Sequence, residues 1–401
     1  MTSETNIFSF GEIADPVEKA RAALRAVRQY QQDWQELGTD RVYKYFDDVE
    51  GDWLENFDEI EVHPSPESLP VISFDEIFSR LKSLGLSNSF IKKAALPSWW
   101  KSEAEYDEGM LARLVKALQQ RLYLEISFQG SSNFELSFHP VSQIKYKLQK
   151  RQENPTLFSY LANSIVNIVL QTVDLPCLSI PIDPYIIREE ILRAHPWVSL
   201  SSLLEFCWNC GLPVIHFDIS DLFVKGNKSP HKSDGLVVIT GERPVIIIGS
   251  SRKPSAWLLF VLAHELGHIA HGHLQEGILS DESFQDGVND EEEEAANQFA
   301  AQLLLGDISP QWAPNLNKQR LLAKAKRLSE EHNLDPGALI LNYGWQTGKW
   351  GCAVGALNLL EPDANAPTQI NDYYQSQLVS IDEESRDYLE RVKILVPQAR
   401  V

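Results

Sequence analysis

The sequence predicts a mainly helical protein of the α+β class: a helical N-terminal region, a domain with a small antiparallel sheet, and a helical C-terminal extension. Two observations carry this prediction. Apolar residues recur at helical spacing over most of the chain. The period changes in DGLVVITGERPVIIIGSS (234–251), where two β-branched runs flank the turn TGERP and predict a β-hairpin.

Changes in composition divide the chain into four expected regions. Residues 1–70 hold a helix over 16–37 and an acidic linker with a Pro-Ser-Pro centre. Residues 71–140 read as several short helices. Residues 141–315 contain the hairpin and a histidine-rich helix, and residues 316–401 form a helical C-terminal region.

Bulk composition limits the location and the partners of the chain. A formal net charge of −20 argues against a general affinity for nucleic acid or anionic membrane. No apolar run is long enough to span a bilayer, and the first residues lack the pattern of a secretory signal. Only 4 cysteines are present, which suits a reducing compartment. We therefore expect the protein in the cytoplasm.

Residues 74–124 contain a helix, a turn at Gly85 and a second helix that begins at a plausible Ser87 cap. This order is compatible with a helix-turn-helix-like unit, and Lys92 and Lys93 would give its second helix a thin basic face. Basic residues barely outnumber acidic ones here. A small helical bundle for packing or partner recognition is an equal interpretation.

The stretch FVLAHELGHIAHGH (260–273) places four histidines and a glutamate in a helix that is otherwise apolar. An apolar helix belongs in a core, where imidazoles and a carboxylate are costly unless something satisfies them. His264 and His268 are one helical turn apart and project from the same side, which suits two ligands of one zinc ion. Glu265 is adjacent and can act as a general base.

A zinc site needs a third protein ligand. The spacing HExxHxxGxxH is absent, so His271 and His273 are more plausibly outer or surface residues than ligands. The other source is the acidic run Glu291–Glu294, which opens an apolar helix and partly serves as its N-terminal charge. Glu292 and Glu293 both lie at the edge of the apolar strip, and periodicity does not choose between them.

Two motifs together resemble the ImmA/IrrE family of zinc metallopeptidases: HELGHIAHGH after a hairpin, and EEAANQFAAQLLL (293–305). The specific likeness covers about 240–306. Ala295 stands where the family commonly has a second acidic residue, and Leu305-Gly306 replaces the usual Met-Pro end. The segment GLSNSFIKKAALPSWW (85–100) also resembles the helix-turn-helix-like region of some members.

The resemblance implies a zincin-like metallopeptidase domain in which His264, His268 and Glu293 bind one zinc ion per chain. It also implies that Glu265 is the catalytic base and that Asn297 orients a ligand. Two histidines and a glutamate favour zinc over manganese. For an oxyanion-stabilising group the sequence offers only His231 and Tyr343, and ordinary surface and core roles are at least as plausible for both.

Three functions remain open at this point. The first is a zinc endopeptidase that cleaves a dedicated protein, which the resemblance suggests is a helix-turn-helix repressor controlling a stress response or a mobile element. We expect such an enzyme to bind an extended substrate along the edge of the hairpin. The second is a regulator that binds DNA or a repressor and has a structural or idle metal site. The third is a toxin-like module held by an antitoxin.

Overall fold

The structure is a computed structural model. It describes residues 74–100, 108–128, 134–139, 144–146, 157–174, 177–218, 234–241, 243–273, 277–280 and 291–397. The chain forms two compact units, Met1–Val71 and Ile72–Val401, and every described residue lies in the second. The helix predicted over 16–37 and the acidic linker lie outside the described residues. Each helix within the described ranges is too short or too polar to cross a bilayer.

A five-stranded mixed sheet of order β3-β7-β5-β6-β4 forms the centre. Its strands are Ile144–Tyr146 (β3), Val214–His216 (β4), Gly235–Thr240 (β5), Arg243–Ile248 (β6) and Gly277–Ser280 (β7). The predicted hairpin is β5-β6, which is antiparallel, and β7 pairs with β5 in the same way. The added edge strands β3 and β4 run parallel to their neighbours. Strands this short carry too little periodicity to be predicted.

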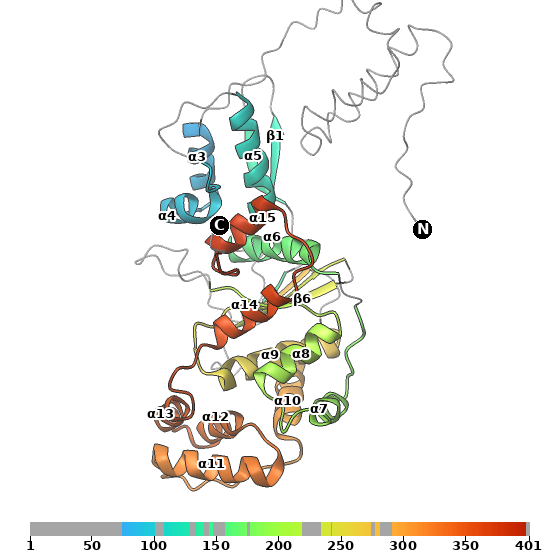
Figure 1. The fold of residues 1–401 in the computed structure, drawn as a ribbon, viewed down its shortest axis with the longest axis vertical. Helices are drawn as coiled ribbons and strands as arrows, with labels where there is room; N and C mark the ends of the chain where they lie inside the picture. Colours follow the sequence, from blue (N-terminus) through green and yellow to red (C-terminus); the bar gives the residue numbers. More distant parts are fainter. Residues whose placement is uncertain are drawn as a thin grey trace, which may run out of the picture. The chain divides into compact units, whose positions relative to one another are not determined.

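The hairpin contributes to two hydrophobic cores, because successive side chains of a strand point to opposite faces. Val237 and Ile246 pack into the core that contains helix α9 (Ser255–Ala270). Leu236 and Val245 pack into the core that contains α6 (Leu157–Thr172). The sheet therefore separates two helical layers, with α6 on one side and α9 on the other (Figure 1).

The remaining helices follow this division. The layer around α9 contains α7 (Pro184–Leu192), α8 (Leu200–Asn209), α10 (Glu291–Leu305), α11 (Lys318–His332), α12 (Pro336–Thr347) and α13 (Trp350–Leu360). The layer around α6 contains α3 (Phe74–Ser83), α4 (Asn88–Phe90), the π-helix η3 (Ile91–Ala95), α5 (Glu108–Leu122), the antiparallel ribbon of β1 (Leu124–Phe128) and β2 (Phe134–Phe138), and α15 (Glu383–Arg391). Helix α14 (Ala366–Ser376) contributes Ile370 to the first core and Tyr374 to the second.

The last helix returns to the N-terminal helices. Arg121 of α5 is fully buried, and its Nη2 lies 2.8 Å from Glu384 Oε2 and 2.6 Å from Asp387 Oδ2 of α15. Figure 1 shows α15 beside α5 and α6, far from α11 to α13. The helical C-terminal region of the sequence is thus shared between the two layers.

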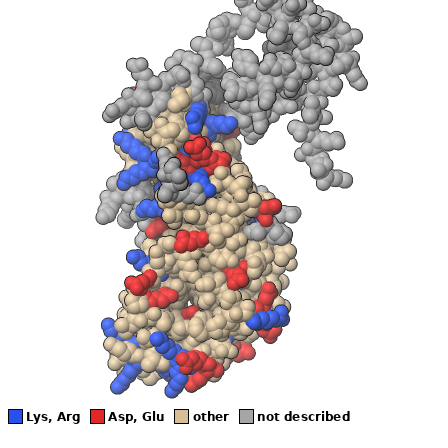
Figure 2. Space-filling model, in the orientation of Figure 1, with Lys and Arg blue, Asp and Glu red and all other residues tan. Residues whose placement is uncertain are grey.

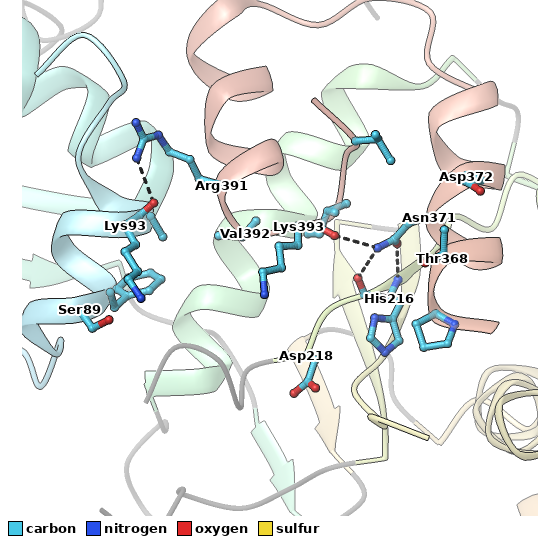
Figure 3. Close-up of a pocket in the computed structure, with 15 residues that line it drawn as sticks. Ser89, Lys93, His216, Asp218, Thr368, Asn371, Asp372, Arg391, Val392 and Lys393 are labelled. Carbon is cyan, nitrogen blue, oxygen red and sulfur yellow. Dashed lines mark hydrogen bonds between the residues drawn. The ribbon is translucent and has the colours of Figure 1, made fainter. Parts of the chain in front are cut away.

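A second group of contacts joins α14 and the C-terminal segment to β4 and η3 (Figure 3). The amide of Asn371 accepts a hydrogen bond from His216 N at 2.8 Å and donates to His216 O at 3.0 Å and to Lys393 O at 3.3 Å. Arg391 donates to Lys93 O at 3.0 Å. These residues line a cavity of about 440 Å³, and none of the predicted metal ligands or catalytic residues is among its lining.

The buried Arg121 yields the first prediction. Arg121→Ala removes the fully buried cation that two carboxylates of α15 share and leaves them only the more exposed Arg113 and Arg391, so we expect the free energy of unfolding to fall by about 3–5 kcal/mol. Arg113→Ala is the matched control, because Arg113 is half-exposed and lies 3.4 Å from the same Glu384; its effect should stay below about 1 kcal/mol. Urea denaturation measures both. Equal effects of the two variants would contradict the assignment.

Two carboxylates that cap helix N-termini have pKa values shifted in opposite directions. Asp335 accepts a hydrogen bond from Ala338 N at 2.8 Å and caps α12, and burial raises its pKa to about 6. Asp382 caps α15 through Ser385 N at 2.9 Å. Burial works against the ionised form of Asp382 as well, but its hydrogen bonds from Ser385 outweigh burial and lower its pKa.

These directions predict a pH dependence. The folded pKa of Asp335 lies above its unfolded value of about 3.9, so its protonated form stabilises the fold below about pH 4, and this stability is lost as pH rises through about 6. Asp335→Asn keeps the cap and should remove this fall in the free energy of unfolding. Asp382→Asn should instead remove stability that is present above about pH 4. Thermal unfolding between about pH 2 and 7 distinguishes the two; profiles identical to that of the wild type would contradict both assignments.

Candidate metal centre

Helix α9 is buried along nearly its whole length, as its apolar sequence predicts. His264 and Glu265 are 0% exposed and His268 is 1% exposed. Proline precedes the helix, and Glu361 Oε2 from the C-terminal part of the chain accepts a hydrogen bond from Ser255 N at 2.8 Å. The N-terminus of α9 is thus capped by a residue that lies far away in the sequence, so this cap could not be predicted from the local sequence.

A close approach of α10 brings Glu293 to the histidines. A Cβ atom at Gly267 would lie 3.1 Å from Ala296 Cα and 3.2 Å from Phe299 Cβ, so the lack of a side chain lets the two helices pack this closely without crowding. Glu293 and Ala296 lie on the buried side of α10. Since Glu293 is three residues before Ala296, it lies one turn along on the same side, facing α9.

The far end of α10 is held by Arg188 of α7. Its buried guanidinium donates to Leu303 O at 3.1 Å and to Leu304 O at 3.2 Å, and it also donates to Asn333 O at 3.1 Å. The last carbonyl groups of a helix have no partner within the helix, so this side chain supplies what α10 lacks. Both ends of the α9–α10 pair are therefore fixed by other elements.

His264, His268 and Glu293 form a compact buried group that could hold a metal ion. The Nε2 atoms of the two histidines lie 3.0 Å apart. Glu293 places Oε2 3.4 Å from His264 Nε2 and Oε1 3.3 Å from His268 Nε2. Tetrahedral donors at about 2.0–2.1 Å from a zinc ion lie about 3.3–3.4 Å from one another. The three side chains therefore have the donor types and nearly the spacing that zinc requires.

Hydrogen bonds on the outer nitrogens orient both imidazoles. His264 Nδ1 lies 3.1 Å from Asn297 Oδ1, and because that oxygen only accepts, His264 carries its proton on Nδ1 and keeps Nε2 free to bind a metal. His268 Nδ1 lies 2.8 Å from His273 Nδ1. Donation from His268 likewise leaves its Nε2 as a donor atom for the ion. This contact agrees with the outer position that the sequence suggested for His273. Which ligand it would touch was not predicted, because the turn after α9 determines it.

Glu265 lies against the first residue of β5. A Cβ atom at Gly235 would collide with Glu265 Oε1 and lie 2.7 Å from its Cδ. The absence of a side chain at Gly235 thus makes room for the carboxylate beside the histidines. This role of Gly235 could not be predicted from the sequence, because the contact joins a strand to a remote helix.

Other candidates lie elsewhere. Glu292 is not part of the metal-ligating group among the described residues. His271 is exposed and stacks on His273 with ring centroids 5.4 Å apart. Tyr343 is buried, and its hydroxyl donates to Pro314 O at 3.4 Å, as a core residue does. His231 lies outside the described residues.

The expectation that the hairpin edge binds substrate is wrong for the stretches that neighbouring strands cover. β7 pairs with residues 236–239 of β5, and β4 pairs with residues 246–248 of β6. The outer edge of β5 is therefore covered over most of its length, and that of β6 over its second half. The sequence could not show this, because the covering strands are only three or four residues long.

A buried His-His-Glu group on two packed helices, with a glutamate next to the first histidine, has the residue types and arrangement expected of a metallopeptidase centre. The comparison with protein families agrees: residues 218–334 match the model Peptidase_M78, the IrrE N-terminal-like domain. The chain thus carries a metallopeptidase domain of the ImmA/IrrE family. Among curated proteins, none matches the chain.

The geometry predicts which side chains retain metal. We expect purified wild-type protein to hold about one zinc ion per chain, and His264→Ala and Glu293→Ala to lose it. Glu292→Ala is the matched control and should keep it, because its carboxylate is outside the group. Elemental mass spectrometry measures the zinc content. A wild-type protein that stays empty after zinc is supplied, or loss in Glu292→Ala alone, would refute the site.

Proposed function

We propose that this protein is a zinc-dependent endopeptidase. The observation that carries the proposal is the buried triangle of His264, His268 and Glu293, with Glu265 in the same helix turn. Burying three such groups is unfavourable without a compensating ion, so their presence together favours a resident metal. The match to a metallopeptidase family supports the same reaction class.

The residues have distinct roles in peptide-bond hydrolysis. His264 and His268 would hold the ion through Nε2, and Glu293 through its carboxylate. A zinc ion bound there would supply a Lewis acid for the scissile carbonyl and a lower pKa for the attacking water. Glu265 takes a proton from that water on a carboxylate oxygen and returns it to the leaving amine. Asn297 and His273 keep the two imidazoles in the tautomer and orientation that ligation needs.

The family implies a protein substrate. We propose a single dedicated substrate, a helix-turn-helix repressor, on the strength of the resemblance of both motifs to the ImmA/IrrE family. We also propose that the enzyme acts in the cytoplasm, which the four free cysteines support.

The charge distribution favours protein recognition over DNA binding by the N-terminal helices. Lys92 and Lys93 are exposed, but they lie on the five-residue π-helix η3 rather than on a long recognition helix. On the face shown in Figure 2, Lys and Arg gather over the N-terminal helices with Asp and Glu among them. DNA binding relies on a basic surface of one sign. The helix-turn-helix-like assignment therefore stays a prediction.

The role of Glu265 gives a test of the reaction. Glu265→Gln keeps the shape but cannot take up a proton, so cleavage should fall by about 100-fold or more with zinc content unchanged. Gly235→Ala should act in the same direction, because its methyl group displaces the carboxylate. Gly351→Ala is the matched control, since nothing lies within 4 Å of an added Cβ there.

The measurement is mass spectrometry of new peptide termini after zinc-loaded protein is incubated with a lysate of the cells that encode it. Cleavage by Glu265→Gln at the wild-type rate would exclude the proposed base. Zinc loss in that variant would instead show that the residue holds the metal.

A further inference from the structure

Four aromatic side chains extend from the metal centre along three helices. They are Trp257 and Phe260 of α9, Trp345 of α12 and Trp350 of α13, here called the aromatic strip. Phe260 is one turn before His264 in α9, and their ring centroids lie 6.4 Å apart. The strip therefore begins against a predicted metal ligand.

Ring contacts continue without interruption from Phe260 outward. The centroid of Trp345 lies 6.4 Å from Phe260, that of Trp350 lies 5.4 Å from Trp345, and that of Trp257 lies 5.6 Å from Trp350. Arg252 covers Trp257 at 3.8 Å and ends the strip with a positive charge.

The strip is partly open to solvent. Trp345 is 48% exposed, and Val354, one turn beyond Trp350 on α13, is 47% exposed. Trp257, Phe260 and Trp350 are half-buried. A tryptophan held at the surface beside a reaction centre is characteristic of a binding surface, because tryptophan supplies a large rigid contact area and is enriched at binding hot spots.

The strip is also preformed. A Cβ atom at Gly344 of α12 would lie 2.7 Å from the ring of Trp350, so this indole packs directly against the backbone of α12. Gly337, at the start of the same helix, packs against Ala256 of α9, where an added Cβ would lie 2.6 Å from Ala256 Cβ. These contacts fix the three helices to one another, so that binding does not have to order the aromatic side chains.

We propose that the aromatic strip binds a large apolar side chain of an extended polypeptide substrate, close to the bond that the metal centre cleaves. This inference rests on the proposed peptidase function. One residue of extended chain spans roughly 3.3–3.6 Å, so Phe260 lies within about two residues of the centre. The strip is continuous with His264, which argues that its occupant is the substrate. Because β7 and β4 pair with the hairpin strands, we expect the substrate to be recognised through its side chains rather than by strand pairing.

A binding assay that requires no cleavage tests the proposal. The full chain carrying Glu265→Gln is titrated into fluorescein-labelled peptides Ser-Ala-Ala-X-Ala-Ala-Ser, with Phe, Leu, Ala or Lys at X, and fluorescence anisotropy is recorded. We expect the Phe and Leu peptides to bind about tenfold more tightly than the Ala and Lys peptides. Adding Trp345→Ala should remove most of this preference, and Trp345→Phe should keep it.

Trp197→Ala is the matched control, because Trp197 is also half-buried but belongs to the segment before α8 rather than to the strip. It should leave the preference unchanged. Zinc content and thermal unfolding, measured on each variant, show that the fold is intact. Equal or undetectable binding of all four peptides at millimolar concentration, or a preference that survives Trp345→Ala, overturns the inference.

The assay separates this inference from the function on which it rests. If the protein takes up no zinc but binds the Phe and Leu peptides through the strip, the peptidase function is refuted and the binding surface is supported. A zinc-loaded wild type that cleaves protein, combined with no preference at X, would leave the peptidase and refute the strip.

Discussion

The rest of the site depends on the contact between α9 and α10 at Gly267. The absence of a side chain there lets the backbone of Ala296 come close enough for Glu293 to reach both histidines. A methyl group at Gly267 would crowd Ala296 and Phe299, and α10 would have to shift by a few tenths of an ångström to accommodate it. The two ends of the pair are fixed as well, by Glu361 at the start of α9 and by Arg188 at the end of α10.

Because the site is buried, its polar side chains need a compensating partner. Two imidazoles and two carboxylates in or beside an apolar helix are expensive to desolvate, and only a cation or a shared proton relieves the cost. The outer hydrogen bonds that His264 donates to Asn297 and His268 donates to His273 leave both Nε2 atoms directed at the same point. The polar side chains of this core therefore converge on one position, that of the candidate metal ion.

The sheet determines which elements lie around the site. It places α9 on one face and the N-terminal helices with α15 on the other, and its hairpin strand β5 begins beside the Glu265 carboxylate. The neighbouring helices α12 and α13 add aromatic side chains that continue from His264 to the surface. The reactive group and the surface next to it thus come from segments spread over more than a hundred residues of chain.

The sequence by itself determined the features that depend on local spacing. Two histidines at i and i+4 share one side of a helix wherever that helix lies, and two β-branched runs around a short turn form a hairpin. Periodicity left Glu292 and Glu293 open, and the tertiary structure places Glu293 beside the histidines, as the family resemblance implied. The tertiary structure alone added β3, β4 and β7 to the hairpin and returned α15 to α5. Periodicity could not settle these points, because they depend on how closely and at what angle remote elements pack, which at Gly267 is a matter of one missing methyl group.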